Sequence, residues 1–328
     1  MPKQDYLTVA LDGGFGGSFN LVKAVNQHSA KYTTALVTSR PSPYAFGEGV
    51  SATHQIETAG PMLGRAERLW ICDCGGLLTI ARYLTIKLGR QVAWEPFHPA
   101  SAPLYAWLRG RSLVFFWSGS AYRDNHAAIN VRVKGLQCAR RYAMCDLLRL
   151  DADAMPLMQT YDDLAPGKDK FPKFTVGHTP GLKYKKGCVE KGTPMIAATL
   201  DALSKQHDLT YVVLKNMPYA DAIKVKAKFH LFVDQIVPDV GGIGKSGLEA
   251  MLLGIPTLCD VGQSLFYGQY AGMPVFHVGN KAELAAQVTT LFTERGLLAD
   301  ATERSLAWAQ RLRFAPTAQY LDETLVWA

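Results

Sequence analysis

Short apolar runs alternate with helix-compatible stretches along most of the chain. The first run, at 6–11, is followed by the glycine loop DGGFGGS and then by a helix-like stretch at 19–28. A second helix is expected over 76–88. Further apolar runs that predict strands lie at 33–38, 68–72, 91–94, 112–117 and 142–145. Strands that alternate with helices predict right-handed crossovers and a mostly parallel sheet.

A polar stretch with three prolines, at 151–173, predicts a linker, after which the alternation begins again. Strands are expected at 174–177, 209–214, 229–233 and 255–259, and helices at 194–206, 220–227 and 245–253. Two or three helices are expected from residue 279 onward, the last of them over 317–327. The pattern predicts two α/β Rossmann-like domains, at 1–165 and 166–328, with the last helix able to pack back on the first domain.

Two such sheets in one chain bind ligands beyond the carboxyl ends of their strands, in a cleft between the domains. Functional residues are therefore sought in the loops that follow strands. The composition supports two buried cores, because 48% of the residues are hydrophobic and only 19% are charged.

The six cysteines include no C-x-x-C pair and no closely spaced framework, so reduced thiols are expected. Cys72 and Cys74 form half of a metal site without a second half, and no metal is predicted. The start of the chain lacks the pattern of a signal peptide, and no 18-residue apolar run is present. We expect a cytoplasmic protein, in a bacterium or a virus-infected host, whose membrane contact is at most peripheral.

The formal net charge of +7 favours anionic partners such as nucleic acid, acidic lipid headgroups or a nucleotide diphosphate. Many basic proteins bind none of these, so the charge alone leaves the partner open. Four lysines gather in one short segment, at Lys183, Lys185, Lys186 and Lys191.

The segment DQIVPDVGGIGKSGLEAMLLGIPTL, at 234–258, is the most informative one. Its glycines allow the backbone to approach a ligand, and a helix that begins near residue 245 directs N–H groups and its positive dipole end toward an anion. Glu249 lies one turn into that helix, where it can accept hydrogen bonds from ribose hydroxyls. The GKS string is not a Walker A motif, because Asp239 stands where that motif requires glycine.

GLEAMLLGIPTL resembles the G-x-x-x-x-EAM-x-x-G-x-P-V segment of retaining GT-B glycosyltransferases of the glycosyl-transferases group 1 family. The resemblance implies two facing Rossmann-like domains with an interdomain cleft, and a nucleotide-sugar donor on the C-terminal one. It implies that Glu249 binds the donor ribose. The turn that would meet the donor phosphates comprises Gly244, Lys245, Ser246 and Gly247. Gly241 stands where many members carry a glutamate that contacts the transferred sugar, which leaves the sugar open.

A second segment, GHTPGLKYKKGCVEKGT at 177–193, resembles the H-x-P…KGT entry to the donor domain of that family. The resemblance implies that Lys191 binds the donor diphosphate, with Thr193 nearby, and a positive charge there would stabilise the departing phosphate. The alternative for the lysine is a solvated basic loop. His178 is a candidate base or ligand, with a structural histidine as its alternative.

Two N-terminal segments are similar to elements that face the cleft in the family. DGGFGGS resembles its glycine loop, which assigns Gly14 and Gly16 to the donor, although this pattern also fits a dinucleotide site or a tight turn. Asp12 is a candidate acid or base, or a turn residue. FWSGSAYR resembles the HGS-x-x-R element, which assigns Ser120 and Arg123 to the acceptor side of the cleft.

The sequence therefore predicts a glycosyltransferase that moves a sugar from a UDP-sugar such as UDP-glucose to an acceptor hydroxyl. No cofactor or metal is expected beyond this co-substrate. The charge favours a 5-hydroxymethylpyrimidine in DNA as acceptor, as in the glucosyltransferases of some bacterial viruses. Synthesis of a cell-surface glycan or glycolipid is an alternative, and a non-catalytic nucleotide-sugar-binding protein is another.

Overall fold

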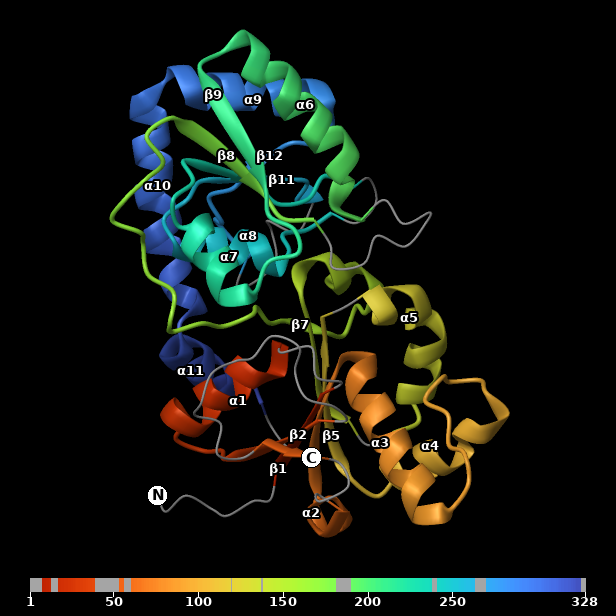
Figure 1. Cartoon of the computed structure of the whole chain (residues 1–328). Helices are drawn as coiled ribbons and strands as arrows, with labels where there is room; N and C mark the ends of the chain where they lie inside the picture. The colour runs from red at the N-terminus through yellow and green to blue at the C-terminus, as the bar shows by residue number, and fades with distance from the viewer. Residues whose placement is uncertain are drawn as a thin grey trace. The chain divides into compact units, whose positions relative to one another are not determined.

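The chain forms two compact units in a computed structural model (Figure 1). The structure describes residues 8–12, 17–38, 53–55, 60–118, 120–136, 138–180, 190–237, 241–262 and 270–325. Unit 1 comprises Met1–Tyr161 and Arg313–Ala328, and unit 2 comprises Asp162–Leu312.

Unit 1 is built on a parallel sheet whose strand order is β3-β2-β1-β4-β5-β6-β7. Its strands are β1 Thr8–Asp12, β2 Thr34–Thr38, β3 Thr53–Gln55, β4 Arg68–Cys72, β5 Ser112–Trp117, β6 Cys138–Ala143 and β7 Met155–Pro156. The central strands β4 and β5 are almost continuously apolar and buried, as a parallel sheet covered on both faces requires. The strand order reverses between β1 and β4.

Helices cover this sheet, and the last helix of the chain is one of them. They are α1 Gly17–His28, α2 Gly60–Arg65, α3 Asp73–Leu88, α4 Ala102–Leu108, α5 Ser120–Val133 and α11 Phe314–Thr324. Helix α11 packs against α1. The Asp322 carboxylate accepts hydrogen bonds from the Ser29 hydroxyl (2.6 Å) and the Ala30 N–H (2.8 Å), and the Tyr32 hydroxyl donates to the Leu325 carbonyl (2.7 Å). The C-terminal segment is thus part of the first unit.

Unit 2 is built on a second parallel sheet, in the order β12-β11-β10-β8-β9. Its strands are β8 Phe174–His178, β9 Leu209–Val213, β10 Leu231–Val233, β11 Thr257–Cys259 and β12 Phe276–His277. Its helices are α6 Thr193–Gln206, α7 Tyr219–Lys226, α8 Lys245–Leu252, α9 Lys281–Thr293 and α10 Arg295–Ala309. Helix α6 packs with α9, α8 packs with α10, and apolar side chains from β8, β10, α6 and α9 form one buried core.

Most elements expected from the apolar pattern are present within a few residues, but the strand expected at 91–94 is wrong. That segment is a loop. The Val92 N–H donates to the Thr85 hydroxyl (3.0 Å), and the Ala93 N–H donates to the Ala100 carbonyl (3.1 Å). Because a helix side chain and a neighbouring loop satisfy these backbone groups, the apolar residues are buried without joining the sheet.

The expected strand at 142–145 and the expected linker at 151–173 also need correction. The strand is Cys138–Ala143, and a 3₁₀ helix, Cys145–Leu150, follows it. Residues 157–161 are buried, and β7 pairs with β6, so the first part of the polar stretch belongs to the sheet of unit 1. The arginines within β6 made this strand appear polar, although Arg141 is paired with Asp151 at 2.7 Å.

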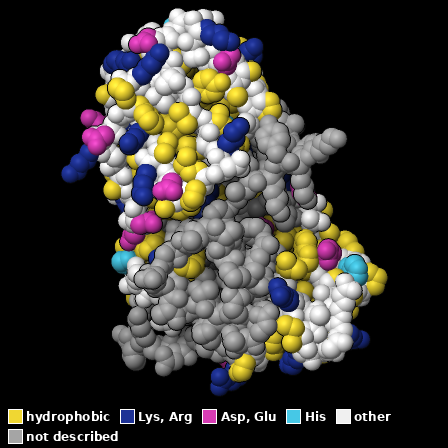
Figure 2. All heavy atoms as spheres, in the orientation of Figure 1, with side chains coloured by type: hydrophobic (Ala, Val, Ile, Leu, Met, Phe, Trp, Pro, Cys, Tyr) yellow, Lys and Arg dark blue, Asp and Glu magenta, His cyan; other side chains and the backbone are white. Residues whose placement is uncertain are grey.

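Among the described helices, none is both long and apolar enough to cross a membrane. On the face shown in Figure 2, the Lys and Arg side chains of the described residues are spread among apolar and acidic ones. The net positive charge is therefore not gathered into one patch on the described part of that face.

Candidate functional site

His178 lies at the carboxyl end of β8 and is fully buried. Its ring nitrogens lie 2.8 Å from the Val233 carbonyl (Nδ1) and 2.8 Å from the Thr193 hydroxyl (Nε2). Burial lowers the pKa of His178 to about 4, so the ring is neutral at physiological pH. Because a carbonyl can only accept, Nδ1 carries the proton, and Nε2 accepts from Thr193. The histidine thereby links the end of β10 to the start of α6.

The turn before α6 holds Lys191 in an unusual backbone conformation. Lys191 has a φ of +63°, in the left-handed region, and Gly192 follows with a φ of +70°. A Cβ on Gly192 would lie 2.2 Å from the Ile236 carbonyl oxygen, so only glycine fits at this point. The Ile236 N–H in turn donates to the Lys191 carbonyl at 3.1 Å. The segment after β10 therefore fixes the backbone of the lysine.

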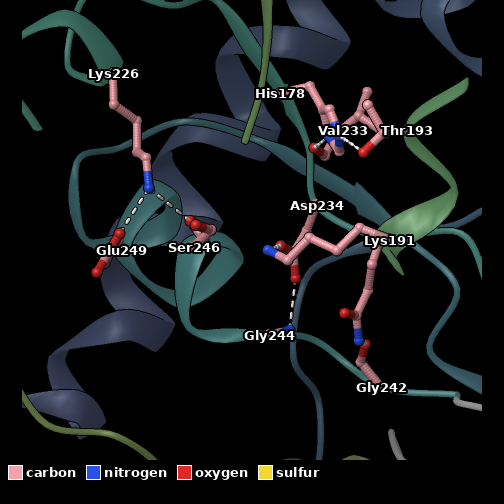
Figure 3. Close-up of polar contacts among 11 residues, drawn as sticks. His178, Lys191, Thr193, Lys226, Val233, Asp234, Gly242, Gly244, Ser246 and Glu249 are labelled. Carbon is pink, nitrogen blue, oxygen red and sulfur yellow. Dashed lines mark hydrogen bonds and ion pairs between the residues drawn. The ribbon is translucent and has the colours of Figure 1, made fainter. Parts of the chain in front are cut away.

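Asp234, the first residue after β10, joins Lys191 to the start of α8. The Lys191 ammonium donates to Asp234 Oδ1 at 2.9 Å, and the Gly244 N–H donates to Oδ2 (Figure 3). Asp234 is fully buried, whereas the Lys191 side chain is 18% exposed. Sequence reasoning assigned no role to Asp234, although a carboxylate directly after a buried strand was a signal that could have pointed to it.

Helix α8 begins in the glycine turn that the sequence singled out. Gly244 is the N-cap residue, and its carbonyl accepts hydrogen bonds from the Gly247 N–H at 3.1 Å and the Leu248 N–H at 3.2 Å. A Cβ on Gly247 would lie 2.5 Å from the Ile243 side chain and 3.0 Å from Asp234 Oδ2, so this turn packs closely against the aspartate. Lys245 places its ammonium over the Tyr219 ring, 5.4 Å from the centroid. Helix dipole, glycine backbone and Lys191 together favour an anion here.

Glu249 lies on α8, buried, and its carboxylate is held by two side chains of α7. The Lys226 ammonium donates to Oε2 at 2.6 Å and to the Ser246 carbonyl at 3.2 Å (Figure 3). The Tyr219 hydroxyl donates to Oε1 at 3.1 Å. Burial and the neighbouring carboxylate raise the pKa of Tyr219, so it remains a donor. The carboxylate predicted to bind ribose thus has a fixed orientation, and sequence reasoning did not find its partners.

Unit 2 therefore brings together the predicted candidate base His178 and most of the predicted donor-binding residues, by polar contacts or by adjacency in one turn. These are His178, Lys191, Thr193, Gly244, Lys245, Ser246, Gly247 and Glu249. Gly241, which stands where relatives carry a glutamate, has a φ of +51°, a conformation that disfavours a side chain.

The remaining predicted residues belong to unit 1. Asp12 is the last residue of β1, Ser120 is the first residue of α5, and Arg123 is half-buried on α5. The side chains of Asp12 and Ser120 lie outside the described residues, as do Gly14, Gly16 and three lysines of the basic cluster, Lys183, Lys185 and Lys186.

A metal site was not expected, and Cys72 and Cys74 are both buried in unit 1. Burial raises the pKa of the Cys74 thiol, which disfavours the thiolate that a metal would require. Within the described ranges, no group of three or more His, Cys, Asp and Glu side chains is placed to hold a metal ion.

The fold has solved counterparts, although no protein-family model and no curated protein sequence matches the chain significantly. HepE from Anabaena, solved in complex with UDP-glucose, is 13% identical with a TM-score of 0.62, over 97% of this chain and 98% of that one. Sucrose-phosphate synthase from Thermosynechococcus elongatus is 9% identical with a TM-score of 0.57, over 96% and 97%. An alpha-glucosyltransferase, solved with UDP-glucose and DNA containing an abasic site, is 7% identical with a TM-score of 0.59, over 95% and 97%.

The chain has the GT-B fold. Two parallel α/β units and full-length agreement with these structures confirm this prediction from the sequence motifs. At such low identity the likeness concerns the fold, and the chemistry must be argued from the residues of unit 2.

Proposed function

We propose that the protein is a glycosyltransferase that moves a sugar from a UDP-sugar, such as UDP-glucose, to an acceptor hydroxyl. The observation that carries this proposal is the placement of the Lys191 ammonium beside the N-terminus of α8, through the shared carboxylate of Asp234. This arrangement offers a point charge and the positive end of a helix dipole to a pyrophosphate. The complexes of HepE and of the alpha-glucosyltransferase with UDP-glucose support the choice of donor.

In the proposed reaction the donor pyrophosphate lies against Lys191 and the turn from Gly244 to Gly247, and the ribose lies against Glu249. The bond between the anomeric carbon and the phosphate oxygen breaks, and the acceptor oxygen bonds that carbon on the same face. The acceptor proton passes to the departing phosphate oxygen, so no protein nucleophile is required. Positive charge at Lys191 and at the helix start stabilises the UDP that departs, without a metal.

On the acceptor side we propose a contribution from Ser120 and Arg123, with Asp12 as the alternative base that would take the acceptor proton in place of the phosphate oxygen. A 5-hydroxymethylpyrimidine in DNA is the proposed acceptor, supported by the structural likeness to the alpha-glucosyltransferase solved with DNA and by the net charge of +7. Transfer of radiolabelled glucose to hydroxymethylated duplex DNA, but not to unmodified DNA, tests this acceptor. Labelling of lipid-linked glycans instead would favour a role in cell-surface synthesis.

The first prediction concerns Lys191. Replacing it with alanine removes the charge that stabilises the departing UDP, so turnover should fall roughly 100-fold. UDP release from UDP-glucose, with and without acceptor, measures this effect. Lys205→Ala is the control, since this exposed lysine on α6 pairs only with Asp201 among the described residues and should leave the rate unchanged. A Lys191→Ala variant with the wild-type rate would contradict the mechanism.

The same assay distinguishes an enzyme from a binding protein. Gly241, in place of a sugar-contacting glutamate, is the feature that favours binding without turnover. A binding protein without turnover would show a higher melting temperature in the presence of UDP-glucose but would release no UDP with any acceptor.

A further inference from the structure

Asp234 contacts both parts of the proposed phosphate site, although the proposed reaction assigns it no contact with the donor. Its two oxygens each accept one hydrogen bond, from the Lys191 ammonium and from the Gly244 N–H. We propose that Asp234 is a positioning residue, which fixes the lysine and the start of α8 relative to each other as one pyrophosphate-binding unit. This role rests on the proposed function.

The chemistry of the site requires a short carboxylate. An asparagine has a single acceptor oxygen, so one of the two donors would face its NH₂ group. A glutamate is longer, and there is no room for it, since a Cβ on Gly244 or on Gly247 would already lie 3.0 Å from Asp234 Oδ2. Aspartate is thus the side chain that can bridge Lys191 and Gly244 at this position.

The ion pair with Asp234 orders the Lys191 side chain before a ligand binds. A lysine side chain loses conformational entropy when it is ordered, and this ion pair already imposes the order. The ammonium group has three protons, and no described residue other than Asp234 accepts a hydrogen bond from it. The remaining protons and the partial exposure of the side chain allow it to face a phosphate.

A carboxylate near a phosphate also weakens phosphate binding, because like charges repel. Here Asp234 is fully buried and both of its oxygens are occupied by donors, so its charge is largely compensated by Lys191. We therefore expect the ordering of Lys191 to outweigh the repulsion. When the charge of Asp234 is removed, loss of ordering predicts weaker UDP binding and loss of repulsion predicts tighter UDP binding. Removal of the charge therefore distinguishes the two effects.

Calorimetric titration with UDP and with uridine tests the role in wild type, Asp234→Asn, Lys191→Met and the double variant. We expect each single variant to bind UDP about tenfold more weakly, as loss of one charge-assisted hydrogen bond implies. The double variant should bind UDP no more weakly than Lys191→Met, because without the lysine the single oxygen of asparagine can still accept from the Gly244 N–H. Uridine, which lacks phosphates, should bind all four chains equally. Asp201→Asn, which removes an exposed ion pair of α6, is the control.

Three results would overturn the role of Asp234. The first is UDP binding by Asp234→Asn that is as tight as in the wild type or tighter. The second is a double variant whose loss of UDP affinity is the product of the two single losses. The third is an equal loss of affinity for UDP and uridine, which would mean that Asp234 only supports the fold. Should Asp234→Asn not fold, Gly244→Ala displaces the carboxylate instead, and undiminished UDP binding by that variant likewise overturns the role. A wild-type chain that binds neither UDP nor uridine overturns the proposed function itself, and the role of Asp234 with it.

Discussion

At the scale of single residues, the described residues of unit 2 form two ion pairs with a fully or almost fully buried carboxylate, and both pairs touch α8 or its N-cap. Lys191 is bonded to Asp234, 43 positions away, and Lys226 is bonded to Glu249, 23 positions away. The motifs pointed to one member of each pair, Lys191 and Glu249, because the sequence shows residue types and spacing. The partners could not be predicted, since side chains so far apart in the chain meet only when the strands are paired in register.

The buried pair of Lys226 and Glu249 gives a prediction at this scale. Lys226→Met leaves a buried carboxylate without its cation, so the free energy of unfolding should fall by about 3 kcal/mol or more. Urea denaturation measures the loss. Replacing both residues, as Lys226→Met with Glu249→Leu, should restore part of it, and Lys224→Met, in an exposed pair with Asp221, should have little effect. A double variant less stable than the single one would refute this account.

At the scale of elements, continuous apolar runs predicted strands well where both faces of the strand are buried, as in β4 and β5. The apolar run at 91–94 is a loop and predicted a strand wrongly, because a buried loop and a buried strand have the same apolar composition. The KGT motif pointed to the turn before α6, but it did not predict the backbone conformation of that turn. Its left-handed residues, Lys191 and Gly192, are fixed by contact with the segment after β10.

Substitution of Gly192 tests the importance of that contact. Gly192→Ala places a Cβ 2.2 Å from the Ile236 carbonyl oxygen, so the turn must move and carry Lys191 with it. Gly272→Ala is the matched control, since Gly272 has a φ of +69° but no atom of the described residues within 4 Å of its added Cβ. The control should lose about 1 kcal/mol of stability from backbone strain alone, measured by urea denaturation. Gly192→Ala should lose clearly more, and equal losses would show that the close contact is unimportant.

At the scale of the whole molecule, the chain returns to its first unit after completing the second. Helix α11 packs on α1, and Asp322 bonds to Ser29 and Ala30 near the end of α1. A change at the C-terminus should therefore affect unit 1. Fluorescence suits the measurement, because five of the six tryptophans belong to unit 1.

Removing the Asp322 carboxylate tests the return of the chain. Asp322→Ala should lower the free energy of unfolding by about 2 kcal/mol, because two hydrogen bonds to a charged group are lost. Glu323→Ala changes the adjacent residue, whose carboxylate accepts only from Gln319 on the same helix among the described residues, and should have little effect. Equal effects of the two variants on the tryptophan-detected urea transition would contradict the anchoring of α11 by Asp322.

The sequence by itself determined the α/β class, most strands of the two sheets, although not β3, β7 or β12, and the glycine-rich segments with Lys191 and Glu249. Hydrophobic periodicity and turn chemistry are properties of short stretches, so these features are visible without a structure. Only the tertiary structure decided the order of the strands, the burial of 157–161, the return of α11 and the bridging position of Asp234. Each of these depends on contacts between segments far apart in the chain. Such contacts form only when each sheet is covered by its own helices.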